Sequence, residues 1–538
     1  MPDLQQFDYV IVGGGSAGCV LANRLSADPA TTVALLEAGS DGTGLLLRVP
    51  VGAVATLPRP WHNWAFESVP QPGLNGRRAY QPRGKALGGS SAINAMIYTR
   101  GHRSDYDHWA ALGNPGWSWD EVLPYFRKAE HNERLANEFH GQGGPLNVAD
   151  LRTDNPWHAR LIEGAREAGF PLTDDFNGAE QEGFGLYQVT QKDGERWSAA
   201  RAYVHPVLAD RPNLQVFAET HALRVLFDGK RATGVEVEQK GSVFTVNARR
   251  ETILSCGALQ TPQLLLVSGV GDGATLQKTG IRLRHHLPGV GRNLQDHLDF
   301  TFAHHVPDTA LFGLTPPGWW PTLRDVLRYR NERRGRFTSN FAEAGGFLRL
   351  TPESAAPEVQ LHVVMAVVDD HARKLHFRHG LSCHVCVLRP KSRGTVTVAG
   401  DDMREPPVID PKYLEHPDDI EQMVGGYHLA RRLLNAPAIR SRLGRDLFTE
   451  GVESEAEVRE VIHARAETIY HPVGTCRMGV DDEAVVDSSL RVRGIGGLRV
   501  VDASVMPTLV GGNTNAPVIM IAEKAAEMIL ASAAERAE

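Results

Sequence analysis

A histidine near the carboxyl end of the chain is placed where it could do acid–base chemistry. His471 stands in the run Tyr-His-Pro-Val-Gly-Thr-Cys-Arg-Met-Gly at 470–479, directly before Pro472. Proline disfavours helical backbone at the preceding residue, so we expect the imidazole on a rigid, extended loop. A neutral imidazole accepts protons near pH 7, which makes His471 a candidate general base. A lone histidine is more often structural, so this assignment depends on the motifs around it.

A second polar cluster follows at 513–515, in the run Gly-Gly-Asn-Thr-Asn-Ala-Pro. Pro517 marks the first turn of a helix, which puts Asn515 near its N-cap. The Asn515 side chain can cap this helix, or it can serve a site toward which the helix N-terminus points. Such an N-terminus stabilises negative charge that develops on a bound group.

Residues 7–39 have the order of a dinucleotide-binding unit. An apolar strand leads into Gly13, Gly15 and Gly18, a helical pattern follows, and a second apolar strand ends at Glu37. The glycines permit a tight turn and let the backbone approach a pyrophosphate at a helix N-terminus. Glu37 can accept hydrogen bonds from ribose hydroxyls and would repel a 2′-phosphate. The unit predicts an adenine dinucleotide, and it leaves FAD and NAD both open.

Two further glycine-rich segments lie at 82–101 and 257–271. In the first, small residues at 88–92 permit a planar ring or a phosphate to lie against the backbone. In the second, an apolar strand runs into a small-residue turn and then a helix, with Pro262 in its first turn. Taken alone, the first is equally a glycine-rich turn and the second is only packing.

The composition is that of a globular protein with two or more domains. The 538 residues are 42% hydrophobic and 22% charged, and the net charge of −7 gives no reason to expect nucleic acid. Five cysteines are too few for a disulfide framework, and Cys383 and Cys386 lie in a segment typical of a buried strand. No signal peptide is evident, and the apolar runs are too short to cross a bilayer. We therefore expect a cytoplasmic protein.

The order of elements predicts an α/β nucleotide domain that is interrupted by a sheet-based lobe. Residues 45–110 are rich in Gly, Pro and Arg, as in a long functional excursion. We expect helices at 116–131, 156–169, 418–436, 454–469 and 517–531, with strands at 214–255, at 341–400 and from Leu498. The expected divisions are a first domain at 1–310 with a lobe excursion at about 151–200, a substrate lobe at 311–450, and a return to the first domain at 451–538.

Together, the segments at 88–101, 257–271, 470–479 and 499–520 resemble the glucose–methanol–choline (GMC) oxidoreductase family. The resemblance runs from Asp8 to about Ile529. It implies FAD, a Rossmann-like FAD-binding domain with an interleaved sheet-based substrate domain, and a carboxyl-terminal family region at about 390–528. Some members attach FAD through a histidine after the Gly-Gly-Ser pattern. Ile93 stands at that position here, so the FAD is expected to be non-covalent.

The resemblance also implies site residues. His471 and Asn515 correspond to the catalytic pair, and no metal is expected. Val225 is expected to contact the adenine through its backbone. The other residues expected to hold FAD are Gly13, Gly15, Ser16, Ala17, Gly18, Glu37, Ala38, Trp64, Arg83, Gly84, Gly89, Ser90, Ser91, Asn94, Ala95, Met96, Asp502, Ala503, Asn513 and Thr514.

Within the family, the chain is similar to bacterial dehydrogenases of aliphatic primary alcohols and to choline and polyethylene glycol dehydrogenases. Stretches such as Leu74-Asn-Gly-Arg and Arg196-Trp-Ser-Ala-Ala-Arg carry this similarity. It implies oxidation of a primary alcohol to the aldehyde, with hydride transfer to flavin N5 and His471 as general base. Electrons would pass to a quinone or another non-oxygen acceptor. An alcohol oxidase and a choline dehydrogenase are the alternatives, and an FAD-containing hydroxynitrile lyase is a remote one.

Residues 311–336 combine Trp319 and Trp320 with a basic run that ends at Arg336. Aromatic and basic side chains together can dock on an anionic membrane, where a quinone is reached. A surface loop with an amphipathic helix over the substrate lobe is the simpler interpretation of the same segment. Peripheral contact with the inner face of a membrane is therefore a hypothesis at this stage.

Overall fold

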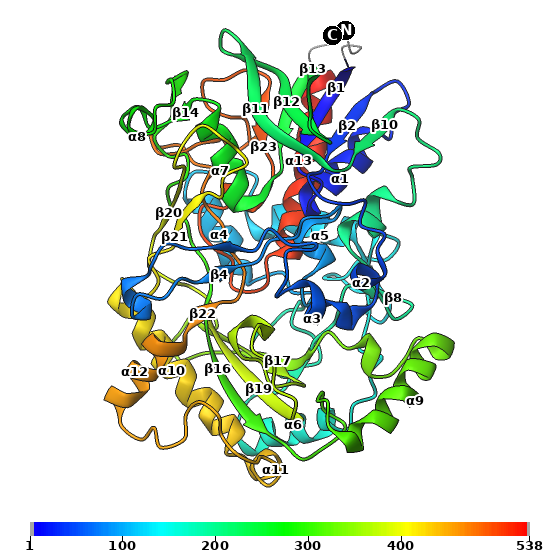
Figure 1. Cartoon of the computed structure of the whole chain (residues 1–538), viewed down its shortest axis with the longest axis vertical. Helices are drawn as coiled ribbons and strands as arrows, with labels where there is room; N and C mark the ends of the chain where they lie inside the picture. The colour runs from blue at the N-terminus through cyan, green and yellow to red at the C-terminus, as the bar shows by residue number, and fades with distance from the viewer. Residues whose placement is uncertain (1–4, 535–538) are drawn as a thin grey trace.

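The computed structural model describes residues 5–534 and has one large sheet in each half of an elongated molecule (Figure 1). The α/β class predicted from the sequence is confirmed. Both chain ends lie in the half that holds the first sheet, at the top of Figure 1.

The first sheet is built around β1, whose residues 8–12 are all buried, as in the centre of a parallel sheet. β1 pairs in parallel with β2 and β13, which places the glycine turn after β1 at the carboxyl edge of the sheet. Ligands bind at this edge in open α/β sheets. The strand order is β10-β2-β1-β13-β12-β11 with β23 beside β13, and the bounds are Gln5–Val12 (β1), Val33–Leu36 (β2), Leu214–Phe217 (β10), Thr220–Asp228 (β11), Arg231–Gln239 (β12), Ser242–Leu254 (β13) and Leu498–Val500 (β23).

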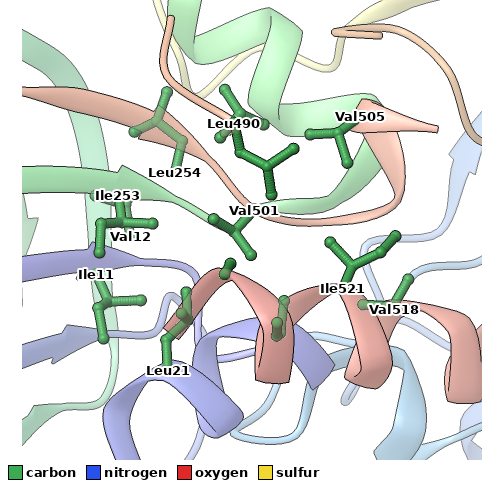
Figure 2. Packing of buried hydrophobic residues seen from close by; sticks show 14 of the residues in the cluster. Ile11, Val12, Leu21, Ile253, Leu254, Leu490, Val501, Val505, Val518 and Ile521 are labelled. Carbon is green, nitrogen blue, oxygen red and sulfur yellow. The ribbon is translucent and has the colours of Figure 1, made fainter. Parts of the chain in front are cut away.

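Two helices from opposite ends of the chain cover this sheet together. α1 (Ser16–Leu25) and α13 (Asn515–Ala534) pack on each other. Figure 2 shows Leu21 of α1 and Ile521 of α13 directed into the same apolar cluster as Val501, which follows β23. The carboxyl-terminal segment therefore belongs to the nucleotide-binding half and completes its core.

The second sheet is antiparallel throughout, and its two faces have different characters. In β16, Phe300 and Phe302 face a buried apolar core, while Asp299 and Thr301 face the opposite side, as the two-residue period of a strand requires. The order is β22-β16-β19-β18-β17-β7, with bounds Gly183–Leu186 (β7), Leu298–His305 (β16), Ala342–Leu348 (β17), Val359–Val364 (β18), Gly380–Val387 (β19) and Glu467–Thr468 (β22).

Helices cover the apolar face of the second sheet. α6 (Trp157–Glu167) contacts β7 and β17, and α10 (Pro417–Leu434) contacts β16, β18 and β19. α12 (Glu455–Arg465) ends four residues before Ile469, because Ala466 turns to extended backbone and β22 follows. α6 and β7 come from the excursion at 151–200, so the second half draws on several separate parts of the chain.

Smaller elements connect the two halves. Residues 45–110 run between the sheets as short helical turns and two-residue strands. Within them Gly89 lies so close to the dinucleotide turn that an added Cβ would come within 2.7 Å of the Gly15 Cα. The remaining bounds are Leu45–Arg48 (α2), Ala53–Thr56 (α3), Phe66–Glu67 (β3), Tyr80–Gln81 (β4), Arg103–Ala111 (α4), Trp119–Ala129 (α5), Glu130–Asn132 (β5), Leu146–Val148 (β6), Gln191–Lys192 (β8), Glu195–Arg196 (β9), Gly257–Val267 (α7), Val270–Gly271 (β14), Gly273–Lys278 (α8), His285–His286 (β15), Pro316–Glu332 (α9), Thr395–Thr397 (β20), Val408–Asp410 (β21) and Pro437–Arg440 (α11). Across residues 5–534, no helix is both long and apolar enough to cross a membrane.

Candidate active site

One cavity of about 730 Å³ runs from the dinucleotide turn to the polar face of the second sheet. Its size is that of a site for a cofactor and a small substrate. Its walls come from both halves of the molecule, including the Gly13 turn at one end and His471 and His362 at the other. The predicted nucleotide site and the predicted catalytic histidine therefore open into the same space.

The turn after β1 has the geometry that a pyrophosphate needs. Gly13 has a φ of +101°, and an added Cβ would come within 2.5 Å of the Ser255 carbonyl oxygen. α1 begins at Ser16 after Gly15, and no side chain caps it. Its first N–H groups are therefore free to bind a phosphate, with the positive end of the helix dipole behind them. Gly18 does not line the cavity; it packs against the Gly13 carbonyl oxygen.

Glu37 lies at the end of β2 and is held by two backbone donors. The Gly14 N–H donates to Oε2 at 3.0 Å, and the Gly39 N–H donates to Oε1 at 2.7 Å. Burial raises the pKa of Glu37 to about 7. The carboxyl group borders the cavity, where it can accept hydrogen bonds from a ribose, as the sequence predicts.

Val225, predicted to contact an adenine, does not line the cavity. Its N–H donates to Ser268 Oγ at 2.8 Å, and its backbone pairs with Val235 in β12, so it lies outside the cavity. The part of β11 that lines the cavity is its start, at Thr220, His221 and Ala222. The cavity-lining part of this strand thus ends three residues before Val225.

The 88–96 segment forms the middle of the cavity wall. Ser91 Oγ donates to the Gly88 carbonyl at 2.6 Å and accepts from the Ala199 N–H at 2.9 Å. Asn94 Oδ1 accepts from the Met96 N–H at 3.0 Å and from the guanidinium of Arg196 at 2.8 Å. The Asn94 amide oxygen is thus occupied, and its NH₂ group is the part left for a bound molecule.

Asp502 uses its carboxylate oxygens to accept hydrogen bonds from the protein itself. Its Oδ2 accepts from the Gly257 N–H at 2.9 Å and from Thr261 Oγ1 at 2.6 Å, and its Oδ1 accepts from the Ser504 N–H at 2.8 Å. Burial raises the pKa of this carboxyl group. Asp502 thereby ties the turn before α7 to the segment that follows β23.

The amide beside His471 belongs to Asn513, and the prediction that Asn515 stands there is corrected. Asn513 Nδ2 lies 3.3 Å from His471 Nε2. Asn515 is the first residue of α13, and its Oδ1 accepts from Ser16 Oγ at 2.7 Å. Asn515 therefore joins the starts of α13 and α1, while Asn513, two residues earlier on the loop, faces the histidine.

A second histidine fixes the tautomer of His471. His297 Nε2 lies 3.0 Å from the Leu388 carbonyl oxygen, which can only accept, so this nitrogen carries the proton. Burial lowers the pKa of His297 to about 3, so the ring is neutral and its Nδ1 is an acceptor. His471 Nδ1, at 2.9 Å, must then be the donor, which leaves a lone pair on His471 Nε2. That nitrogen faces Asn513 and the cavity.

Backbone contacts hold this pair in place. The His471 N–H donates to Asp296 Oδ1 at 2.8 Å, and Asp296 also accepts from Thr468 Oγ1 and the Tyr413 hydroxyl. Burial, the nearby His297 and His362 rings and the Arg83 charge lower the pKa of His471 well below its ordinary value. The imidazole is therefore neutral at pH 7.

The polar face of the second sheet closes the far end of the cavity. Thr301 of β16, His384 of β19 and His362 of β18 lie directly opposite one another across the strands. Asp299 Oδ2 lies 2.6 Å from His384 Nδ1, while Asp299 Oδ1 has no partner among residues 5–534. Both ring nitrogens of His362 also lack a partner within that range. Asp299, His362 and His384 all line the cavity, while the three unpartnered atoms are themselves buried in its wall.

The sequence reasoning missed His297, Asp296 and the sheet histidines. His297 and Asp296 end the run Gly-Val-Gly-Arg-Asn-Leu-Gln-Asp-His at 289–297. A small-residue turn that leads into Asp-His before a strand was a usable signal. The histidines at 362 and 384 gave no local signal, because only strand register brings them together.

Two family models, both described as GMC oxidoreductase, match residues 7–299 and 390–522. The chain belongs to the GMC oxidoreductase family. The alcohol dehydrogenase (acceptor) of Pseudomonas putida is 48% identical over 533 residues, which cover 97% of this chain and 96% of the relative. The mitochondrial choline dehydrogenase of Homo sapiens is 42% identical over 537 residues, with 97% and 90% covered. One similar solved structure is that of Aspergillus oryzae formate oxidase, from a study of FAD modification in that enzyme. It superposes on this chain with a TM-score of 0.90, at 28% identity and 99% coverage of both chains.

GMC oxidoreductases bind FAD, so this chain is an FAD-dependent oxidoreductase, and the prediction of FAD is confirmed. The cavity fits FAD: it joins an uncapped helix N-terminus, a carboxyl group placed for ribose and a neutral histidine pair in one continuous space. Ile93 lines it with an apolar side chain. The predicted site residues that line it are Gly13, Gly15, Ser16, Ala17, Glu37, Ala38, Trp64, Arg83, Gly84, Gly89, Ser90, Ser91, Asn94, Ala95, Met96, His471, Asp502, Ala503, Asn513, Thr514 and Asn515.

Proposed function

We propose that the protein oxidises a primary alcohol to the aldehyde and passes the electrons to a quinone or another non-oxygen acceptor. The observation that carries this proposal is the lone pair on His471 Nε2, held toward the cavity by His297 and faced by the amide of Asn513. FAD supplies, when bound, the acceptor for the hydride that leaves the carbinol carbon.

The chain's own residues handle the proton of the alcohol. His471 Nε2 accepts the hydroxyl proton as general base, and the resulting imidazolium is stabilised because its Nδ1–H donates to His297. Asn513 donates from Nδ2 to the substrate oxygen and holds it next to the base. The depressed pKa of His471 keeps it unprotonated before the reaction, so substrate binding meets a competent base.

The proposed acceptor and location follow from the relatives and from residues 311–336. The Pseudomonas putida relative is named for an acceptor and not for oxygen. A quinone is dissolved in the lipid bilayer, so a protein that reduces it must contact the surface of that bilayer. The proposal therefore includes peripheral contact with the inner face of a membrane.

Anaerobic flavin bleaching tests the reaction. The holoenzyme is mixed without oxygen with n-butanol, n-octanol, benzyl alcohol, a glycol ether or choline, and flavin absorbance and aldehyde are followed. We expect a primary alcohol to bleach the flavin and to yield one aldehyde per flavin. No bleaching with any alcohol, together with cleavage of a cyanohydrin, would establish a lyase instead. Turnover in air with stoichiometric peroxide, as fast as with a quinone analogue, would establish an oxidase.

Choline is a second candidate substrate, because a carboxylate lies in the cavity wall. Asp299 lines the cavity, and its Oδ1 is buried with no hydrogen-bond partner among residues 5–534, so its negative charge can attract a quaternary ammonium group in the cavity. Asp299→Asn separates the two candidates. For a choline dehydrogenase, the KM for choline should rise at least tenfold while the KM for n-butanol stays unchanged.

A further inference from the structure

The outward face of α9 is apolar, whereas a helix on the surface of a globular protein normally turns its polar side outward. Its buried positions include Asp325 and Tyr329. Trp319 and Trp320 are 66% and 76% exposed, and Leu323 follows on the same face. α9 stands at the edge of the molecule beside the second sheet (Figure 1). The apolar face of this helix has no partner within residues 5–534.

A second segment extends the apolar surface. Phe377 is 61% exposed, and its carbonyl oxygen accepts from the Leu314 N–H at 2.8 Å, which places the two side by side. Leu314 is itself 65% exposed. We call the combined surface the apolar rim, and it consists of Leu314, Trp319, Trp320, Leu323, Leu327, Leu375 and Phe377.

The charges around the apolar rim oppose the charge of the whole protein. The net charge is −7, yet residues 311–336 contain six arginines and only two acidic residues. Among residues 5–534, Arg324, Arg330 and Arg378 are exposed and form no ion pair, so their charges face outward unneutralised. Apolar side chains, two tryptophans and free arginines on one face are what an anionic lipid surface binds.

The apolar rim also borders the opening of the cavity. Leu314 and Leu375 are in the rim and line the cavity as well, as does Lys374, which directly precedes Leu375. A lipid surface against the rim would therefore lie at the entrance to the site that contains His471. Apolar alcohols and quinones are enriched in lipid, so this placement shortens their path to the site.

We propose that the apolar rim binds the surface of an anionic lipid bilayer and that the active-site cavity opens toward that bilayer. The part that concerns entry of reactants rests on the proposed function. The binding itself does not, because it is measured without turnover.

Vesicle flotation tests the surface. The holoenzyme is mixed with vesicles of phosphatidylcholine alone or with phosphatidylglycerol added. We expect binding to the anionic vesicles and at least about tenfold weaker partition for Trp319→Gln/Trp320→Gln and for Arg324→Gln/Arg330→Gln. Val243→Gln is the control, since Val243 is an apolar residue that is 53% exposed in β13, in the other half of the molecule.

Three results would overturn the proposal. They are no binding of the wild type to anionic vesicles, unchanged binding of both double variants, and a wild-type dimer in sedimentation that the tryptophan variant converts to a monomer. The last would assign the rim to a second copy of this chain. Alcohol oxidation with a soluble dye is measured in parallel, so loss of the proposed activity is not confused with loss of membrane binding.

A separate observation concerns a buried cation behind the FAD site. Arg196 is fully buried, and no carboxylate among residues 5–534 pairs with it. Its Nη1 donates to the Ser91 carbonyl at 3.2 Å and to Asn94 Oδ1 at 2.8 Å, while Nε and Nη2 have no hydrogen-bond partner in the described part of the chain. A buried guanidinium without an anion is costly, so a negative charge is expected nearby in the complete enzyme.

We infer that Arg196 is a positioning residue for FAD. Arg196 donates a hydrogen bond to the Asn94 side-chain oxygen, and this leaves the Asn94 NH₂ group for the cavity. Arg196 also places a positive charge behind the part of the cavity wall that FAD would contact. Bound FAD, which is an anion, then supplies the missing counter-charge. In Arg196→Met, we expect at least tenfold weaker FAD binding to the apoprotein and a lower flavin midpoint potential.

Arg196→Lys is the matched variant, because it keeps the charge but replaces the three nitrogens of the guanidinium by one ammonium nitrogen. We expect it to recover most of the midpoint potential. A purely structural role for Arg196 predicts a lower melting temperature in Arg196→Met with wild-type FAD affinity and potential, and that result would overturn the inference. An Arg196→Met protein that does not fold is replaced by Asn94→Ala, for which the same two measurements apply.

Discussion

Replacing His297 tests the tautomer argument directly. In His297→Leu, the His471 Nδ1–H loses its acceptor in a buried site. His471 then either keeps an unsatisfied donor or moves its proton to Nε2, where the ring can no longer accept the proton of the alcohol. Either outcome weakens the proposed base without changing His471 itself.

The size of the effect follows from the cost of one buried, unsatisfied donor. That cost is about 1–3 kcal/mol, and each 1.4 kcal/mol is about tenfold in rate, so flavin reduction should slow by about 5- to 150-fold. His297→Asn is the matched control, because its side-chain oxygen can stand near the present Nδ1 and accept the same proton. We expect it to lose less than about tenfold.

Anaerobic stopped-flow measures this step without the acceptor. The limiting rate of flavin bleaching is compared for the wild type, His297→Leu and His297→Asn at saturating alcohol. FAD content and melting temperature are recorded to exclude unfolded protein. If His297→Leu reduces its flavin at the wild-type rate, or if the two variants behave alike, His297 does not set the state of His471 and the reasoning fails.

Four further outcomes are expected. His471→Ala should slow flavin reduction by about 10²–10⁴-fold with FAD still bound, and near-normal reduction in stopped flow would remove it as the base. Asn513→Ala should lose about tenfold or more in the same assay, whereas Asn515→Ala should stay within about fivefold of wild type; the reverse order would restore the sequence prediction. Burial lowers the pKa of His362 to about 3, below its unfolded value of about 6.5, so the unfolded chain binds more protons in this window. Relative to His362→Gln, the wild type should therefore lose about 1.4 kcal/mol of unfolding free energy per pH unit as pH falls below about 6.5, and equal slopes in urea titrations at several pH values would contradict this. With Ile93 at the attachment position, acid precipitation should release the flavin into the supernatant, and flavin that stays in the pellet would show a covalent link.

Local patterns predicted those parts of the site that lie within one segment. The turn at Gly13, the acid at Glu37 and the extended loop at His471 all depend on neighbours close in sequence, and the structure has them in place. The choice between Asn513 and Asn515 depended on which side chain points back from the helix start. The Asn515 side chain is directed toward Ser16, which lies 499 residues away in the sequence, so no local sequence pattern could predict this direction.

The polar wall of the cavity could not be predicted for a similar reason. Asp299, His362 and His384 lie on three strands, and the sequence shows which residues of each strand share a face. It does not show which of the two faces α10 covers, and that decides whether these side chains face the cavity. The strands themselves were expected within 341–400, while β16 lies before 311 and joins the same sheet. Register and sheet membership are properties of the folded chain, so the pattern of each strand alone leaves them undetermined.

The joining of α1 and α13 has a consequence for how the protein is made in the cell. Ser16 contacts Asn515 and Arg24 contacts Glu523, so α1 is synthesised long before α13, with which its packing is completed. His471 and Asn513, the proposed base and its partner, are also synthesised late. A chain cut short by a premature stop therefore exposes apolar surface on its first sheet at the same time as it lacks activity. Exposed apolar surface is what protein quality control recognises, so we expect a chain that stops before α13 to be degraded rather than kept as a flavoprotein with an incomplete site.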